Sequence, residues 1–205
     1  MNRFTVLAFY TEQTPYEQVM QDYLLPSLKK FELPHIIKKV KNQGSWHKNT
    51  CLKPYLIEEA FKETKEDTLV MLDADTTVEA YPTLFNEIPE EFDIAVHYLD
   101  WDSWYLQKEH ISELMSCTLF IRNNERTKKL LKNWKERLKK ETKFEQLVLQ
   151  DVIKEQTDIK VYELPLEYCY ITSMPDGSQP NVVCKAPIIC QHQISRQLKR
   201  KIQKT

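Results

Sequence analysis

Glycine is nearly absent from this chain, and its scarcity excludes two common ways of binding a nucleotide. The 205 residues include only two glycines, Gly44 and Gly177. A Walker A loop and a dinucleotide-binding loop each need several glycines, because their backbone amides must approach phosphate closely. Neither loop can be built from this sequence, so a nucleotide would have to be bound in another way.

Long hydrophobic runs are also missing, and the cysteines follow no metal-binding pattern. No uninterrupted apolar segment has the length that a bilayer-spanning helix needs, and Met1–Arg3 leads straight into a strand-like segment rather than into a signal peptide. The five cysteines are an odd number without C-x-x-C spacing, which argues against a zinc site and against a disulfide framework. We therefore expect a cytoplasmic protein with no transmembrane segment and with free, buried thiols.

Positive charge is unevenly distributed along an otherwise ordinary sequence. The formal net charge is only -1, yet basic residues gather between Arg126 and Lys143 and again between Arg196 and Lys204. With 41% hydrophobic and 29% charged residues, the composition is that of a globular protein, and 205 residues suit one core better than two. We expect a single domain over residues 1–205 with two basic segments.

Apolar strands alternate with amphipathic helices along the chain. This alternation predicts an α/β fold with a mainly parallel, mixed sheet flanked by helices, whose ligand lies beyond the carboxyl ends of the strands. Strands are expected at 4–10, 35–40, 68–72, 93–98, 117–122 and 160–164. Helices are expected after Thr14 as N-cap, from Thr50 to Thr64, and at 82–85, 126–140 and 143–155.

The most informative segment is Thr68–Asp75, in which an apolar strand ends in two carboxylates. Since strand side chains alternate, Asp73 and Asp75 are expected on the same side, where the strand leaves the core. Carboxylate oxygens suit Mg²⁺ or Mn²⁺, and such ions complete their coordination with substrate phosphates and water. The pair therefore predicts a metal site for a diphosphate-bearing substrate. The alternative is that the two aspartates only begin a turn.

Taken in order, several parts of the chain resemble the GT-A family of nucleotide-sugar-dependent glycosyltransferases. They are a first strand ending at Thr11, the Lys53-Pro54 helix, the block Met71–Asp75, the strand 117–122, an acidic and amide-rich helix, and a late His192. The resemblance implies one Rossmann-like GT-A domain with a donor-binding half over about 1–98, an acceptor-side half over about 99–195 and a basic tail over 196–205.

The resemblance also implies an activity. It is metal-dependent transfer of a sugar from a nucleotide-diphosphate sugar to an acceptor hydroxyl, with a UDP-sugar as the favoured donor. The acceptor would be a glycan, a lipid-linked sugar or a nucleic acid.

Donor and metal contacts follow from the same resemblance. Tyr10 and Thr11 would contact the base or ribose. Asp75 would bind the metal directly, and Asp73 would contact the metal or the ribose. His192 would be a third metal ligand, and an imidazole beside two carboxylates favours Mn²⁺ over Mg²⁺. The alternative for His192 is an ordinary residue at the end of a strand.

Further residues would surround the donor. Lys53 would contact phosphate or sugar, although an exposed lysine in a first helical turn is an equal alternative. Trp46 would close over the nucleotide from the preceding loop, or else pack within that loop. Arg196 and Lys199 would neutralise the diphosphate, unless they belong to a solvated basic tail.

Aromatic residues alternate with carboxylates over 97–105, a pattern that suits contact with a sugar. The alternative is a buried aromatic cluster. Asp100 and Asp102 in this segment form a second D-x-D. It ranks below the first as a metal site, because no long buried strand leads directly into it.

An acidic or amide pair near the reacting sugar is also implied by the resemblance, and two pairs fit: Glu145 with Gln146, or Gln150 with Asp151. An inverting enzyme would use Asp100, Asp102, Glu145 or Asp151 as general base, whereas a retaining enzyme needs no base on that face.

Two other activities stay open at this point. A sugar-phosphate nucleotidyltransferase would use the same fold, but residues 11–16 contain no glycine for the loop that such enzymes need. A nucleic-acid-binding protein would use the two basic segments on phosphates.

Overall fold

A central six-stranded sheet organises the chain, with the strand order β2-β1-β3-β6-β5-β7. The structure is a computed structural model that describes residues 3–174, 176–194 and 197–198. Arg196, Lys199 and the rest of the predicted basic tail, apart from 197 and 198, lie outside the described residues. The strands of this sheet are β1 (Thr5–Thr11), β2 (His35–Val40), β3 (Thr68–Leu72), β5 (Ile94–Asp100), β6 (Ser112–Arg122) and β7 (Val161–Glu163).

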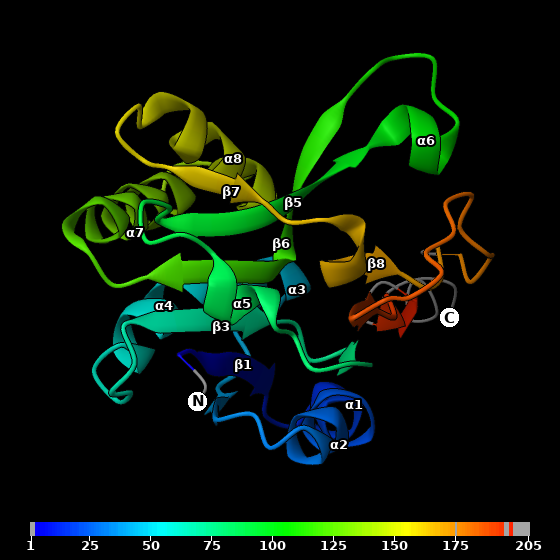
Figure 1. Cartoon of the computed structure of the whole chain (residues 1–205), viewed down its shortest axis with the longest axis horizontal. Coiled ribbons are helices and arrows are strands. Elements are labelled where there is room, and N and C mark those ends of the chain that lie inside the picture. Colours follow the sequence, from blue (N-terminus) through cyan, green and yellow to red (C-terminus); the bar gives the residue numbers. More distant parts are fainter. Residues whose placement is uncertain (1–2, 175, 195–196, 199–205) are drawn as a thin grey trace.

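The sheet is mixed and mainly parallel. β1 pairs in parallel with β2 and β3, and β5 pairs in parallel with β7, whereas β6 runs antiparallel to β3 and β5. Figure 1 shows helices arranged around these strands, which confirms the predicted α/β class. The helices are α1 (Tyr16–Asp22), α2 (Leu24–Lys30), α3 (Trp46–Thr50), α4 (Lys53–Ala60), α5 (Leu84–Glu87), α6 (Trp101–Tyr105), α7 (Glu125–Leu138) and α8 (Glu145–Glu155), with a 3₁₀ turn at Leu166–Tyr168.

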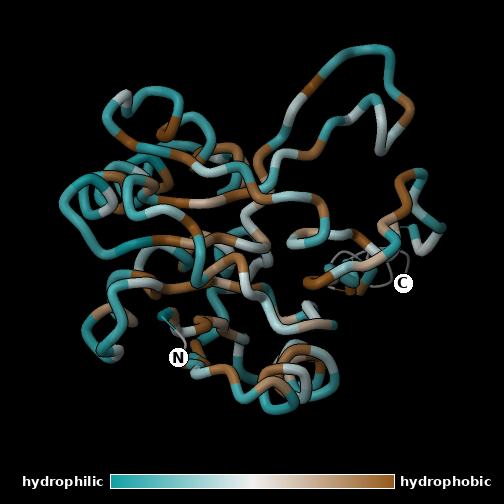
Figure 2. Tube along the Cα trace, viewed as in Figure 1, coloured by the Kyte–Doolittle hydropathy of each residue, from teal (hydrophilic) through white to brown (hydrophobic). Residues whose placement is uncertain are grey.

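Alternating side chains of the strands feed one hydrophobic core on each face of the sheet. In β1, Val6 and Ala8 belong to the core that contains residues of α1, α2 and α5, and Leu7 belongs to the core that contains residues of α4, α7 and α8. Trp134 of α7 is fully buried in the second core. Much of the central strands is brown in Figure 2, which marks hydrophobic residues. Both faces of these strands are covered by helices. This double burial explains why these strands read as continuous apolar runs.

A second, three-stranded sheet brings late residues back to the end of β3. It contains β4 (Thr76–Val78), β9 (Ile189–Gln191) and β8 (Tyr170–Ile171) in the order β4-β9-β8. β4 begins directly after Asp75 and pairs antiparallel with β9, so that Thr76 lies opposite Gln191. The D-x-D segment is therefore flanked by residues more than a hundred positions away in the sequence.

β5 and β6 extend beyond the sheet as an antiparallel pair that carries α6 between them. Leu99 pairs with Glu113 and Asp100 with Ser112. Figure 1 shows this hairpin projecting from the body, and we call residues 99–113 the arm. The predicted start of the strand 117–122 is wrong, because pairing within the arm extends β6 back to Ser112.

Two predicted helix starts are also wrong. Thr14 is not the N-cap of α1, which begins one residue later than expected; the Thr14 hydroxyl instead accepts a hydrogen bond from the Tyr16 backbone amide at 3.3 Å. The helix expected from Thr50 to Thr64 is α4, which begins at Lys53 and ends at Ala60, whereas Thr50 is the last residue of α3. Pro54 has no amide hydrogen to offer the Thr50 carbonyl, which separates α4 from α3.

The cysteines match the expectation of free thiols, and three of the five match the expectation of burial. All five cysteines lie in the described part of the chain and are free, and three of them are buried while Cys51 and Cys184 are half-buried. In the described part of the chain, no helix combines the length and the apolarity that crossing a membrane requires.

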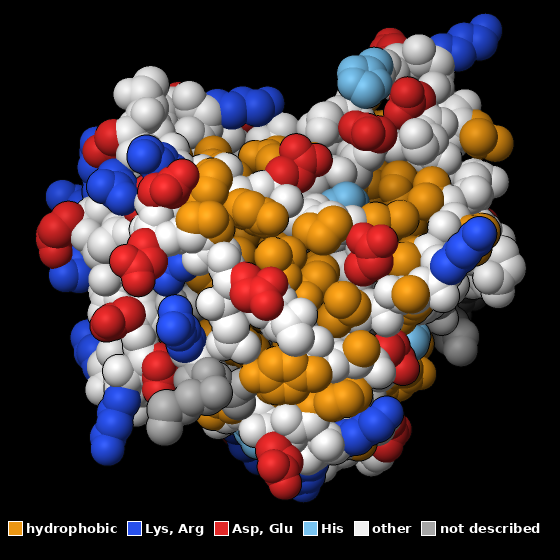
Figure 3. Space-filling model, viewed as in Figure 1, with side chains coloured by type: hydrophobic (Ala, Val, Ile, Leu, Met, Phe, Trp, Pro, Cys, Tyr) orange, Lys and Arg blue, Asp and Glu red, His pale blue; other side chains and the backbone are white. Residues whose placement is uncertain are grey.

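The basic residues of α7 are largely matched by acidic partners. Lys129 pairs with Asp158, Lys135 with Glu58, and Arg137 with Glu141 and Glu155, at N···O distances between 2.7 and 3.3 Å. On the face shown in Figure 3, blue and red side chains are interspersed on the side where α4 and α7 lie. The predicted basic segment is therefore a mixed-charge surface, which weakens the nucleic-acid-binding alternative.

Asp93, just before β5, supplies a test of the fold. Its fully buried carboxylate accepts hydrogen bonds from Arg126 at 2.6 and 2.7 Å, from Asn124 at 2.8 Å and from the Lys160 amide at 2.8 Å. Burial opposes ionisation, but these hydrogen bonds outweigh it and lower the pKa of Asp93. A lowered pKa contributes stability above the unfolded-state pKa of about 4, and this contribution disappears as pH falls through the folded-state pKa.

We expect Asp93→Asn to lower the free energy of unfolding by about 2–4 kcal/mol at neutral pH, because buried donors lose their charged acceptor. Urea unfolding followed by circular dichroism measures this difference, which should shrink below about pH 4. Asp158→Asn is the matched control, since its exposed ion pair with Lys129 contributes less than about 1 kcal/mol. Equal losses for the two variants would contradict this account.

Candidate active site

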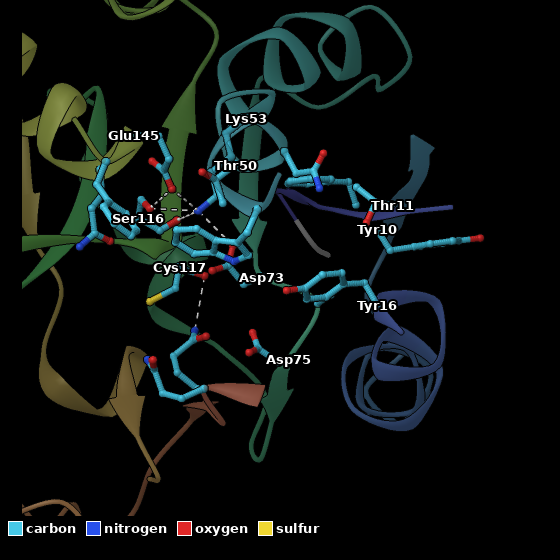
Figure 4. Close-up of a pocket in the computed structure, with 18 of the residues that line it drawn as sticks. Tyr10, Thr11, Tyr16, Thr50, Lys53, Asp73, Asp75, Ser116, Cys117 and Glu145 are labelled. Atoms are coloured by element: carbon cyan, nitrogen blue, oxygen red, sulfur yellow. Dashed lines mark hydrogen bonds and ion pairs between the residues drawn. The ribbon is translucent and has the colours of Figure 1, made fainter. Parts of the chain in front are cut away.

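A pocket opens beyond the carboxyl ends of β1 and β3, at the edge where the strand order predicts a ligand. In Figure 4, Tyr10, Thr11 and Tyr16 lie on one side of Asp73, and Ser116 and Glu145 lie on the other. The pocket is lined by Phe9, Tyr10, Thr11, Tyr16, Trp46, Asn49, Thr50, Lys53, Asp73, Ala74, Asp75, Met115, Ser116, Cys117, Phe144, Glu145, Gln146, Gln191 and Gln193.

The ammonium group of Lys53 is buried between two carboxylates in the wall of this pocket. Its Nζ lies 3.0 Å from Asp73 Oδ1, 2.9 Å from Glu145 Oε1 and 3.0 Å from the Ser116 hydroxyl, and it also donates to the Ser116 carbonyl at 3.1 Å. Burial disfavours the charged form, but the carboxylates of Asp73 and Glu145 outweigh it and hold the pKa of Lys53 well above its ordinary value. The lysine is therefore a fixed positive charge.

This environment replaces one interpretation of Lys53. The side chain is only 2% exposed, so the alternative of an exposed first-turn lysine is wrong. All of its polar contacts are made to protein atoms of Asp73, Ser116 and Glu145 in the described part of the chain. Lys53 thus joins α4 to the end of β3, to β6 and to the first residue of α8.

Asp73 and Asp75 both line the pocket, although they belong to a turn rather than to the strand. β3 ends at Leu72, and the Thr76 amide donates to the Asp73 carbonyl at 3.2 Å before β4 begins. Asp75 is buried and the Asp73 side chain is about one-third exposed. Burial, and then the carboxylates of Asp75 and Asp73, raise the pKa of the Tyr16 phenol to about 12. The phenol is therefore a hydrogen-bond donor at neutral pH.

His192 lies beside Asp75 through the backbone, with its amide donating to the Asp75 carbonyl at 3.0 Å. Its ring is held elsewhere: Nε2 lies 2.8 Å from the Thr77 hydroxyl and Nδ1 lies 3.1 Å from the Thr172 hydroxyl. Burial lowers the pKa of His192, against the carboxylates of Asp75 and Glu79. Among the described residues, no cluster of three or more His, Cys, Asp or Glu side chains could hold a metal ion. The structure does not assemble the two aspartates and His192 into such a cluster.

The four candidate general bases are separated by the fold. All four are described, and Glu145 lines the pocket whereas Asp100, Asp102 and Asp151 do not. Asp100 and Asp102 lie on the arm, and Asp151 forms an ion pair with Lys143 at 2.9 Å. The pair at the start of α8, Glu145 with Gln146, is thus the one that the structure places at the pocket.

Several pocket residues were not expected from the sequence. Tyr16 and Ser116 are polar residues within amphipathic or apolar segments, and no local pattern marks them. Gln191 is buried beside His192; it accepts a hydrogen bond from Thr76 at 2.8 Å and donates to Thr118 at 3.1 Å. Because these contacts join distant parts of the chain, only the fold reveals them.

Comparison with known proteins identifies the family. A family model described as nucleotide-diphospho-sugar transferase matches residues 34–204, which is most of the chain. The chain belongs to this family. It is a glycosyltransferase of the nucleotide-diphospho-sugar type, and the family implies a nucleotide sugar as its donor. No curated protein sequence matches this transferase.

Solved structures share the fold of this nucleotide-diphospho-sugar transferase at low sequence identity. A glycosyltransferase involved in the glycosylation of the major capsid of PBCV-1 aligns with a TM-score of 0.67 at 12% identity, over 97% of this chain and 98% of that one. Mouse xyloside xylosyltransferase 1 aligns with a TM-score of 0.58 at 8% identity, over 94% and 98%. The glycosyltransferase GlyE of Streptococcus pneumoniae TIGR4 aligns with a TM-score of 0.60 at 14% identity, over 91% of this chain and 53% of that one. These likenesses confirm the GT-A-type fold.

The buried lysine of this transferase can be tested without substrate. We expect Lys53→Met to lower the free energy of unfolding by about 3–5 kcal/mol, because it leaves the carboxylates of Asp73 and Glu145 without their cation. Adding Glu145→Gln should recover part of this loss, since one of the two uncompensated charges is removed. Lys62→Met, an exposed lysine beyond α4, is the control and should change stability by less than about 0.5 kcal/mol. Urea unfolding measures these free energies, and a Lys53→Met protein as stable as the control would refute the ion-pair account.

Proposed function

We propose that this glycosyltransferase moves a sugar from a UDP-sugar to an acceptor hydroxyl, and that it requires Mn²⁺ or Mg²⁺ bound by Asp75 and Asp73. The observation that carries the proposal is the arrangement of the pocket around these two carboxylates. Tyr10, Thr11 and Tyr16 lie on one side of Asp73, where the resemblance puts the base and ribose. Glu145 lies on the other side, where the resemblance puts the sugar.

Two carboxylates fit a magnesium-type site. Such ions take one or two protein carboxylates and complete their octahedron with phosphate oxygens and water, so a third protein ligand is not needed. The raised pKa of Tyr16, due to burial and then to Asp75 and Asp73, supports a shared negative field at this point. When bound, the ion would supply Lewis-acid stabilisation of the departing diphosphate. His192 would have to leave its threonine hydroxyls to join the set, so we propose the two aspartates as the ligands.

The remaining residues would position the donor. Lys53 would hold Asp73 in the orientation needed at the diphosphate, and the phenol of Tyr16 would donate to the diphosphate or to a carboxylate. Glu145 Oε1 is bound to Lys53 and Ser116, while its Oε2 is buried without a hydrogen-bond partner in the described part of the chain. An unpartnered buried acceptor is costly, so we propose that Oε2 accepts a hydrogen bond from a sugar hydroxyl.

The choice of general base depends on which candidate carboxylate lies at the pocket. If transfer inverts the anomeric centre, Glu145 is the base we propose, because it is the candidate that lines the pocket. The arm, with its aromatic residues and carboxylates, and the other residues of the 99–195 half would bind the acceptor. The donor half over 1–98 would include the residues of β1, α3 and α4 that line the pocket.

Donor hydrolysis tests the proposal, because slow hydrolysis needs no known acceptor. The purified protein is incubated with UDP-, GDP- and CDP-sugars in Mn²⁺ and then in EDTA, and released nucleoside diphosphate is measured. We expect release from a UDP-sugar that EDTA abolishes, and we expect Asp75→Asn to lower the rate by about 10²–10³-fold. Release that is insensitive to EDTA would contradict the metal proposal. Release from GDP- or CDP-sugars alone would contradict the proposal that the donor carries uracil.

Asp67→Asn is the matched control for this assay. The substitution has the same chemistry, and Asp67 is exposed at the opposite end of β3. We expect it to leave donor hydrolysis unchanged. Both variants should keep the melting temperature of the unmodified protein within about 3 °C, so that loss of activity in Asp75→Asn reports on the site rather than on folding.

A further inference from the structure

Glu113, at the base of the arm, connects the arm to the wall of the donor pocket. It is half-buried on β6, opposite Leu99 of β5. Its Oε2 accepts a hydrogen bond from the indole N–H of Trp101 at 2.7 Å, and its Oε1 accepts one from the side-chain amide of Gln146. Trp101 belongs to α6 on the arm and Gln146 lines the pocket, so one carboxylate spans the two regions.

A second amide of α8 fixes the same junction. Gln150 Oε1 accepts a hydrogen bond from the Leu114 backbone amide at 2.8 Å, and its Nε2 donates to the Ser112 carbonyl at 3.2 Å. These contacts are made immediately before and after Glu113 on β6. The base of the arm is thus held against α8 on both sides of Glu113, which keeps Glu113 within reach of Gln146.

The chemistry of a carboxylate determines which way the Gln146 amide is turned. An ionised carboxylate can only accept hydrogen bonds, whereas a side-chain amide carries a donor NH₂ and an acceptor oxygen. Glu113 therefore binds the NH₂ of Gln146 and leaves the amide oxygen as its other polar atom. No donor among the described residues reaches that oxygen. Gln146 is only 7% exposed and lines the pocket, so the pocket is where its oxygen can find a partner.

We propose that Glu113 is a positioning residue of this transferase. It turns the Gln146 amide so that the donor pocket presents an acceptor oxygen to a sugar hydroxyl, and it ties this orientation to Trp101 on the arm. The inference rests on the proposed function for the sugar and on the two hydrogen bonds for the positioning.

Replacing Glu113 by Gln should reverse the polarity of the Gln146 amide. The new side chain has one acceptor oxygen, and the rigid indole N–H of Trp101 needs it. Its NH₂ then faces Gln146, which must turn its own oxygen toward the introduced amide and its NH₂ toward the pocket. The pocket thereby exchanges an acceptor for a donor. Since a hydroxyl can also accept a hydrogen bond, we expect a moderate effect, about a tenfold loss in kcat/KM for donor hydrolysis.

A swap of the two residues should restore the original arrangement. In the double variant Glu113→Gln with Gln146→Glu, the amide introduced at position 113 donates its NH₂ to the carboxylate at position 146, and its oxygen accepts from Trp101. The second carboxylate oxygen at position 146 is again an acceptor for the pocket. The single variant Gln146→Glu instead sets two carboxylates against each other, which destabilises the junction and should make donor hydrolysis fall as pH rises.

The experiment compares the unmodified protein, the two single variants and the swap. We expect kcat/KM for donor hydrolysis to fall about tenfold in each single variant and to return to within about threefold in the swap, whereas UDP affinity by calorimetry is unchanged throughout. Glu91→Gln is the matched control, because Glu91 is exposed in the loop before β5 and lies outside the arm; it should behave as the unmodified protein. A swap no better than the weaker single variant would overturn the proposal, as would activity of Glu113→Gln equal to that of the control.

Thermal unfolding of the same proteins separates this inference from the proposed function. If residues 113 and 146 are hydrogen-bonded as described, the swap melts at a higher temperature than Gln146→Glu alone, and this result needs no substrate. If the swap recovers stability but the unmodified protein does not hydrolyse a donor, the hydrogen bond between residues 113 and 146 is supported and the proposed function is refuted. Hydrolysis in the unmodified protein without any recovery in the swap would keep the function and refute the positioning role.

Discussion

The buried ammonium of Lys53 is the interaction on which the pocket depends. Two carboxylates from separate elements, Asp73 after β3 and Glu145 at the start of α8, meet a single cation supplied by the first residue of α4. A charge in this position costs several kcal/mol to desolvate, and removing one partner of such a cluster leaves the others uncompensated. The cluster is therefore a weak source of net stability but a strong constraint on geometry. It fixes how α4, β6 and α8 converge on the turn that follows β3.

The sequence predicts most of the sheet and little of the pocket wall. The strand at 68–72 appears with the expected bounds, because double burial leaves an apolar run that needs no tertiary information. The strand at 35–40 also has its expected bounds, although it is an edge strand without a buried residue. Asp73 and Asp75 could be placed in the pocket because they follow the apolar run at 68–72. Lys53 was expected near the donor from the resemblance, but its burial could not be predicted, because that burial depends on carboxylates that are distant in sequence. The arm and the contacts of Glu113 were missed because they depend on strand pairing and on α8.

The pattern of charges along the sequence is the poorest guide to the charges on the folded surface. The segment 126–143 reads as strongly basic, yet its lysines and arginines meet acidic residues of α4, α8 and the loop before β7. A linear count records the positive side chains and omits the partners that the fold brings to them. His192 shows the same limit for metal sites: it lies next to Asp75 along the backbone, while its ring is turned toward two threonines.

The position of β9 between β4 and β8 has a consequence for the order in which the molecule matures. β1 and β3 leave the ribosome early, and the Asp73–Asp75 turn with them, but Gln191 and the strand that covers this turn are made more than a hundred residues later. Domains begin to fold from the amino-terminal side during synthesis. A nascent chain would thus carry its acidic turn exposed until β9 inserts, and the pocket becomes complete only when that last strand is in place.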